Sequence, residues 1–121
     1  MIAVAEPGSI DFRTLTREAE APGISSQATT VEDARWAMVD YELGAARREW
    51  CEDGHRGLVV RGAVEYEFVD GRAPLRVAAG EAFRLPPGPA HRGRNVGDGP
   101  ARLFLIDDAV PSEEKPCPQS A

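Results

Sequence analysis

Short runs in which apolar and polar residues alternate dominate the chain from Ala34 onward. In the segment 64–68, Val64, Tyr66 and Phe68 alternate with two glutamates. This pattern predicts a half-buried antiparallel strand with one face against a core. The segment 55–62 is instead apolar on both faces in its middle. It predicts a strand that a second sheet or a second subunit covers on its outer side.

The same pattern predicts further short strands and no amphipathic helix between residues 34 and 108. The expected strands are 35–41, 49–51, 55–60, 64–69, 75–78, 82–85, 91–96 and 102–107. Asp-Gly pairs at 53–54, 70–71 and 98–99 separate several of them. Such pairs favour tight turns, because glycine tolerates positive φ and aspartate can bond its own backbone. Strands of this length and spacing predict an all-β sandwich or barrel.

The two ends of the chain show no such regular pattern. Residues 1–30 alternate only loosely, which predicts a strand or short arm, and the proline-containing segment from Pro111 to Ala121 predicts a disordered tail. A chain of 121 residues supports one domain. We therefore expect an N-terminal arm or strand at 1–33, a barrel at 34–108 and a disordered tail at 109–121.

Composition and charge exclude several classes of protein. The formal net charge is −6, from 20 acidic and 14 basic residues, and no basic stripe is present, which argues against a nucleic-acid partner. No apolar run approaches the roughly 20 residues of a membrane-spanning helix. Residues 1–9 lack the pattern of a secretion signal, and two cysteines give no disulfide framework. We therefore expect a cytoplasmic protein.

Other chemical motifs are weak. The glycine-rich segment 93–99 has no helix after it, so it does not predict a phosphate cradle. Cys51 with His55 or His91 could form a thiol and base pair, since an adjacent base can activate a thiolate. The larger apolar side chains are core candidates before they are pocket lining: Trp36, Met38, Tyr66, Phe68, Phe83 and Phe104.

One spacing is specific. Gly80, Pro86, Gly88, His91 and Asn95 are separated by five, one, two and three residues. All five positions match the second signature of the cupin superfamily, which the chain resembles from about residue 34 to 108. The resemblance implies a double-stranded β-helix, or jelly roll, of the RmlC-like kind. It also implies that His91 points into the barrel, where cupins commonly bind a metal.

The first cupin signature is altered in this chain. With Gly62 as the fixed glycine, the resemblance puts His55 at the position of the usual glutamate. Glu49 and Cys51 then stand where the two usual histidines would be. Glu49 and Cys51 are two residues apart, so on an extended segment they would share a face. The resemblance thus implies a metal set of His91, His55, Glu49 and Cys51.

The chemistry of that set leaves the metal open among iron, manganese, nickel and zinc. Two histidines and one carboxylate are the ligands of non-haem iron oxygenases, which keep open positions. If Cys51 also binds, four protein ligands favour a closed zinc site. An open site implies catalysis, and a closed one implies a structural metal.

The resemblance implies a homodimer that binds a divalent transition metal and acts on a small organic molecule. Dioxygenase, isomerase or epimerase, and polyketide cyclase-like activities all occur on the fold, and the fold does not choose among them. The alternative is a non-catalytic ligand-binding or sensor cupin, with a structural metal or none. The sequence assigns no catalytic residue, and whether the protein is an enzyme stays open.

Overall fold

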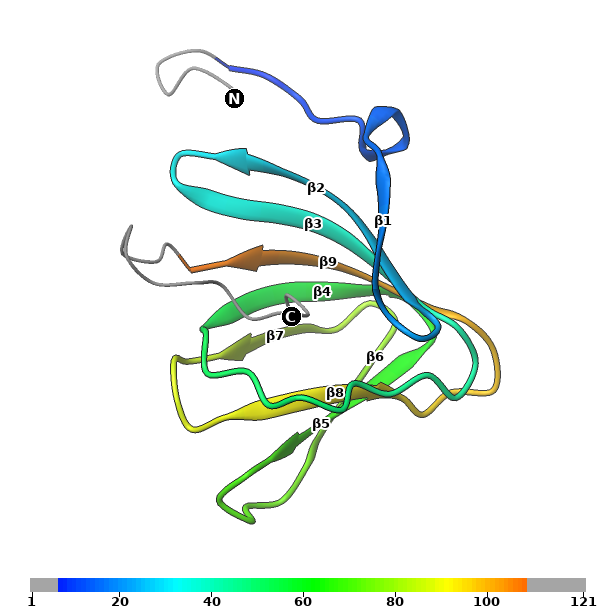
Figure 1. The fold of residues 1–121 in the computed structure, drawn as a ribbon, viewed down its shortest axis with the longest axis vertical. Helices are drawn as coiled ribbons and strands as arrows, with labels where there is room; N and C mark the ends of the chain where they lie inside the picture. The colour runs from blue at the N-terminus through cyan, green and yellow to red at the C-terminus, as the bar shows by residue number, and fades with distance from the viewer. Residues whose placement is uncertain (1–6, 109–121) are drawn as a thin grey trace.

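The computed structural model of the protein describes residues 7–108. Its strands form two antiparallel sheets, which confirms the predicted all-β jelly roll (Figure 1). The larger sheet has six strands in the order β1-β2-β3-β9-β4-β7, and the smaller has three in the order β6-β5-β8. No helix in the described range is long and apolar enough to cross a membrane.

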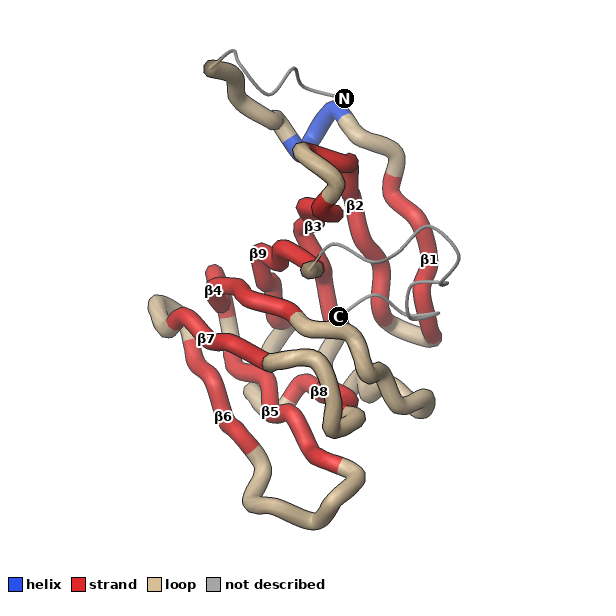
Figure 2. The backbone as a smooth tube through the Cα atoms, turned by 90° about the vertical axis from the view of Figure 1, so that its left-hand side faces the viewer, coloured by secondary structure: helices blue, strands red, loops and turns tan. Residues whose placement is uncertain are grey.

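Most elements follow one another with short connections, as the turn signals predict, but residues 42–54 between β3 and β4 form a longer connection. The elements are the 3-10 helix η1 (Phe12–Thr14) and the strands β1 (Arg17–Ala21), β2 (Ile24–Val31), β3 (Ala34–Tyr41), β4 (His55–Arg61), β5 (Ala63–Phe68), β6 (Leu75–Ala78), β7 (Ala82–Leu85), β8 (His91–Asn95) and β9 (Ala101–Asp107). The tube drawing shows the small sheet next to the β4 and β7 end of the large one (Figure 2).

The core lies between the two sheets. Val39 and Leu103 from the large sheet pack with Val64 and Tyr66 from the small one, and all four are buried. Alternation along β5 therefore works as predicted, with its two glutamates turned away from the core and only partly buried. Among the other predicted core aromatics, Phe83 is also buried.

Three of the predicted core residues lie on the outer face of the large sheet instead. Trp36, Met38 and Phe104 are only partly buried. Trp36 and Phe104 meet edge to face across β3 and β9, with ring centroids 5.8 Å apart. Alternation explains the difference, since each of these residues stands between inward-facing neighbours in its strand.

The outer face of β4 is open in the single chain. Leu58 and Val60 are 40% and 49% exposed, although the sequence predicted cover on both sides of this strand. No second sheet of the described chain covers them. A second subunit that covers this face stays a prediction.

The segment predicted as an N-terminal arm contributes two full strands. β1 and β2 form a hairpin, and β2 pairs with β3 along its whole length, from Ile24 opposite Tyr41 to Val31 opposite Ala34. The hairpin thus extends the large sheet by two strands. Residues 1–6 of the predicted arm and the predicted tail at 109–121 lie outside the described residues.

Candidate functional site

A row of paired residues crosses the inner face of the large sheet. Arg35 on β3 pairs with Asp107 on β9, and Asp107 pairs with His55 on β4. Directly paired residues of antiparallel strands point to the same side of the sheet. The row therefore brings a guanidinium, a carboxylate and an imidazole together on the face that carries the core.

His55 is held by the carboxylate beside it. Its side chain is fully buried, and its Nδ1 lies 2.8 Å from Oδ1 of Asp107. An ionised carboxylate only accepts hydrogen bonds, so Nδ1 carries the proton and donates it. The lone pair is then on Nε2, which points away from Asp107. This is the arrangement that orients metal-binding histidines in proteins.

His91 comes from the opposite sheet. Its ring centroid lies 4.9 Å from that of His55, and the two rings meet edge to face. The residue is completely buried, and neither ring nitrogen has a hydrogen-bond partner within the described part of the chain. Buried polar groups in proteins normally have a partner. The ring nitrogens of His91 are the strongest sign of an absent ligand at this site.

Burial also sets the charge of His91. Loss of solvent, and next the nearby His55, lower the pKa of His91 from 6.5 to about 4. The Pro89 carbonyl acts in the opposite direction but does not meet the geometry of a hydrogen bond with the ring. The ring is therefore neutral near pH 7, which leaves one nitrogen with a lone pair, as metal coordination requires.

Cys51 is the third member of the group. Its backbone forms an isolated bridge with His91, and its Sγ lies 3.5 Å from Nε2 of His55. One ligand atom from each of these three residues lies within 4.8 Å of the others. Cys51 is disulfide-bonded in this structure, although the sequence predicted no disulfide framework. Its sulfur can therefore act as a thiolate ligand only after reduction.

The structure does not bring Glu49 to this group. Its side chain is exposed, and residues 49–51 form no strand, since only Cys51 makes a bridge there. The alternation that predicted a shared face for Glu49 and Cys51 therefore does not apply. Trp50 does point elsewhere, with the guanidinium of Arg92 4.1 Å from its ring centroid.

The carboxylate of the site is Asp107, which sequence reasoning missed. A signal was present in the strand predicted at 102–107. Leu103 and Leu105 face the core, so alternation puts Asp107 on the same inner face. A carboxylate in that register needs a buried partner, and His55 provides it.

Buried charges continue the row towards the N-terminal hairpin. Glu20 accepts from Nη2 of Arg35 at 3.1 Å and from Nη2 of Arg47 at 2.8 Å. The side chains of Glu20 and Arg47 are 7% and 1% exposed. Arg47 also donates from Nε to the hydroxyl of Tyr41 at 2.9 Å. These ion pairs link β1 to the wall of the site.

The donor set fits a divalent transition metal. His55 presents Nε2, His91 has two buried nitrogens that find no hydrogen-bond partner among residues 7–108, and Cys51 can add a sulfur once it is reduced. Imidazole and thiolate are ligands for zinc, iron and nickel, and carboxylate oxygen suits manganese better. Without Glu49 the set has three protein ligands, which leaves a position open.

Comparison with known proteins agrees with this fold. A family model described as Cupin domain matches residues 45–107, a little more than half of the chain. No curated protein matches the chain. Many solved structures do match it, with low sequence identity.

Three of these structures illustrate the sequence identity, TM-score and coverage of the matches. An RmlC-like cupin from Shewanella frigidimarina is 15% identical, with a TM-score of 0.68, and the match covers 89% of this chain and 96% of that one. The polyketide cyclase RemF from Streptomyces resistomycificus is 12% identical, with a TM-score of 0.70 and coverage of 93% and 86%. A sugar phosphate isomerase of a cupin superfamily from Silicibacter pomeroyi is 20% identical, with a TM-score of 0.69 and coverage of 86% and 77%.

At such identities the structures show the fold alone, and the family model shows the family. The matched region contains Cys51, His55, His91 and Asp107. The chain therefore belongs to the cupin family.

Proposed function

We propose that the protein is a small cupin that holds a divalent transition metal between His55 and His91 and acts on a small organic molecule. One observation carries the proposal: the fully buried ring of His91, with no hydrogen-bond partner in the described chain, lies beside His55, whose Nε2 faces away from Asp107. An imidazole without a partner in the protein interior is costly unless a ligand completes it.

The protein residues have distinct parts in this proposal. Asp107 fixes the tautomer of His55 and turns Nε2 towards His91. Burial keeps His91 neutral, so that it can coordinate at physiological pH. A bound divalent ion would supply Lewis-acid chemistry towards an oxygen atom of the molecule in the barrel. Neighbouring structures that carry isomerase and cyclase names support a small-molecule substrate of this kind.

The proposed ligand set differs from the set that the sequence signature implies. Glu49 is exposed, so we leave it out of the ligand set, and Cys51 enters only as a thiolate. Two imidazoles and a thiolate favour zinc among iron, manganese, nickel and zinc, because thiolate is the softest ligand present. The fourth position would be open to water or substrate.

Metal analysis tests the proposal. The chain is stripped with a chelator, dialysed against each of the four ions with and without the reductant TCEP, and analysed by mass spectrometry. We expect about one ion per chain, and loss of that ion in His55→Ala and in His91→Ala. The control Glu49→Gln should bind as the parent does. No ion under either condition, or an unchanged ion content in His91→Ala, would refute the proposal.

The same measurement defines the role of Cys51. A serine hydroxyl is a poor zinc ligand, so Cys51→Ser should weaken zinc binding if the reduced thiolate coordinates. If TCEP leaves zinc content unchanged and Cys51→Ser binds as the parent does, then the two histidines bind without the sulfur. The thiol-catalysis alternative predicts instead that iodoacetamide modifies Cys51 rapidly after reduction.

A non-catalytic ligand-binding or sensor cupin is the second candidate. The observation that favours it is the exposed Glu49, because the site then lacks the carboxylate ligand of the iron oxygenases. Water relaxation measurements on the manganese- or nickel-loaded protein distinguish the two candidates. A bound metal that exchanges no water would support the non-catalytic cupin, and a metal-bound water would support an open, reactive site.

We also propose a homodimer and a cytoplasmic location. Leu58 and Val60 on the outer face of β4 are exposed, and Leu58 pairs with the partly buried Phe104, which gives an apolar surface for a second copy. A cytoplasmic location requires Cys51 to be reduced there, because disulfides are rare in reducing compartments.

A further inference from the structure

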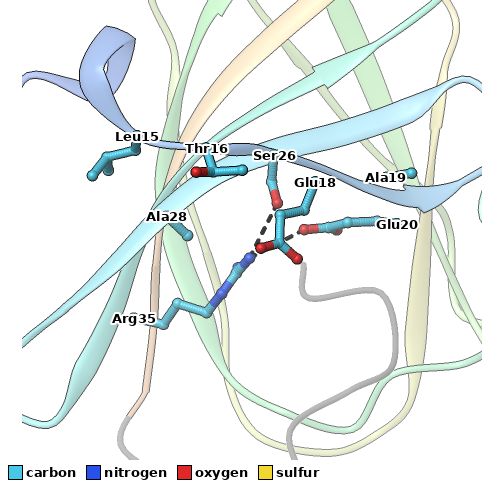
Figure 3. A pocket seen from close by; sticks show the side chains of 8 residues that line it. All are labelled: Leu15, Thr16, Glu18, Ala19, Glu20, Ser26, Ala28 and Arg35. Atoms are coloured by element: carbon cyan, nitrogen blue, oxygen red, sulfur yellow. Dashed lines mark hydrogen bonds and ion pairs between the residues drawn. The ribbon is translucent and has the colours of Figure 1, made fainter.

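A cavity lies under the N-terminal hairpin, on the inner side of the large sheet (Figure 3). Its volume is about 510 Å³, within the usual range of small-molecule sites. We call it the hairpin cavity. Its wall includes the side chains Thr16, Glu18, Glu20, Ser26, Ala28 and Arg35.

Strand pairing explains why these side chains meet. Glu18 pairs with Ser26, and Ser26 pairs with the core residue Val39. All three side chains therefore lie on the inner face of the large sheet, the face that carries the core. β1 is irregular between Ala19 and Ala21, and at this irregularity Glu20 also turns inwards to the two arginines. The cavity is thus built by strands that lie outside the matched cupin region.

One side chain joins the hairpin cavity to the histidine pair. Arg35 lines the cavity, and its Nη1 lies 3.7 Å from Oδ2 of Asp107. The other oxygen of that carboxylate binds Nδ1 of His55. A molecule in the cavity would therefore contact a guanidinium that is one carboxylate away from the proposed metal ligand.

The charged side chains around the hairpin cavity carry a net negative charge. Arg35 and Arg47 share Glu20, and Arg35 also meets Asp107. These four charges balance one another. Glu18 is the remaining one: it is exposed at the cavity and makes no hydrogen bond or ion pair with any described residue. A ligand carboxylate or phosphate would meet the negative charge of Glu18, and the Arg35 nitrogen that has no hydrogen-bond partner, Nη1, already faces the carboxylate of Asp107 at 3.7 Å.

The wall of the hairpin cavity offers a ligand both a hydrogen-bond donor and a hydrogen-bond acceptor. Oγ of Ser26 accepts from Nη2 of Arg35 at 3.2 Å, so the proton of Ser26 remains available for a ligand oxygen. The carboxylate of Glu18 accepts only. A ligand that carries several hydroxyl groups can donate to Glu18 and accept from Ser26 at the same time.

We propose that the hairpin cavity binds the molecule on which the site acts, and that this molecule is a hydroxylated compound that is uncharged or cationic rather than anionic. The inference rests on the proposed function, because it gives the substrate class of the same site. It names Glu18 as the residue that sets the preference for charge.

Three probes of nearly equal size test this preference: glucose, glucosamine and glucuronate. They share a pyranose ring and differ in charge. Binding is followed by amide chemical shifts of the isotope-labelled chain, in metal-free and zinc-loaded protein. We expect glucosamine and glucose to shift the amides of Thr16, Glu18 and Ser26, and glucuronate to bind at least about tenfold more weakly.

A matched pair of variants isolates the charge. Glu18→Gln should reduce the preference for glucosamine over glucuronate by about tenfold. Glu32→Gln removes the same charge from the exposed β2–β3 turn of the same sheet and should leave the preference unchanged.

Each outcome is decisive for one proposal. Tighter binding of glucuronate than of glucose, no shifts from any probe at about 50 mM, or shifts that do not include the hairpin cavity would overturn the inference. Zinc content is measured on the same samples. If the protein binds the probes as expected but takes up none of the four ions, the metal centre is refuted and the charge preference stands. If the protein takes up an ion but binds no probe, the metal centre stands and the inference about the hairpin cavity is refuted.

Discussion

Lowering the pH should destabilise the metal-free protein in a way that depends on His91. Burial lowers the pKa of His91 from 6.5 in the unfolded chain to about 4 in the folded one. Between these values the unfolded chain binds a proton that the folded chain excludes. The stability that the neutral ring contributes is therefore fully present above pH 6.5 and is lost as the pH falls towards 4.

The magnitude follows from the size of this pKa difference. Each unit corresponds to about 1.4 kcal/mol, and the loss begins just below the unfolded value. Between pH 7 and pH 5 the free energy of unfolding should fall by about 2 kcal/mol on account of His91 alone. Stopping at pH 5 keeps the protein above the range in which ordinary aspartates and glutamates titrate.

Urea unfolding with EDTA present, followed by tryptophan fluorescence at both pH values, measures the change. His91→Gln cannot gain the ring proton, so its free energy of unfolding should fall by about 2 kcal/mol less over the same interval. Every other titrating group is shared by the two proteins. If both lose the same free energy, then the ring of His91 is not buried and neutral in the folded protein, and the reasoning fails.

Three further changes test other parts of the structure. Asp107→Asn weakens the support of His55, so calorimetry should show zinc affinity lower by about 10- to 100-fold; unchanged affinity would exclude an orienting role for this carboxylate. Gly57→Ala puts a Cβ 2.3 Å from the backbone oxygen of Phe104, so its melting temperature should drop by several degrees, whereas Gly99→Ala, with no atom nearby, should not change it. Leu58→Glu should convert a dimer into monomers in light scattering, and a parent chain that is already monomeric contradicts the homodimer.

Most of the barrel could be predicted because its signals are local. Alternation along β5 and the Asp-Gly turns depend only on neighbouring residues, and the strands at 75–78 and 82–85 begin and end where the sequence predicted. The N-terminal hairpin was harder to predict. β2 is rich in serine and threonine, and its strand conformation depends on pairing with β3, a contact that period-two alternation does not encode.

The residues of the site also fall into those that the sequence could identify and those that it could not. His55, His91 and Cys51 could be identified from spacing, because the two cupin signatures fix their positions along the chain. Glu49 shows the limit of that approach. Its expected position assumed an extended segment, but residues 49–51 meet β8 only at the isolated bridge between Cys51 and His91, so alternation does not hold. Asp107 could be reached only by combining strand alternation with the pairing of β4 and β9.

The charges around the site imply that the hairpin and the matched cupin region work as one unit. Asp107 and His55 belong to the match at 45–107, but Arg35 and Glu20 precede it. Without β1, the buried Arg47 would lose its ion pair with Glu20, and removing one partner of a buried ion pair destabilises a protein by several kcal/mol. Arg35 would lose the same partner and be left with Asp107, whose other oxygen orients His55. The electrostatics of the proposed metal centre therefore depend on strands that the family signature does not include, and the properties of other cupins cannot be transferred to this site from the signature alone.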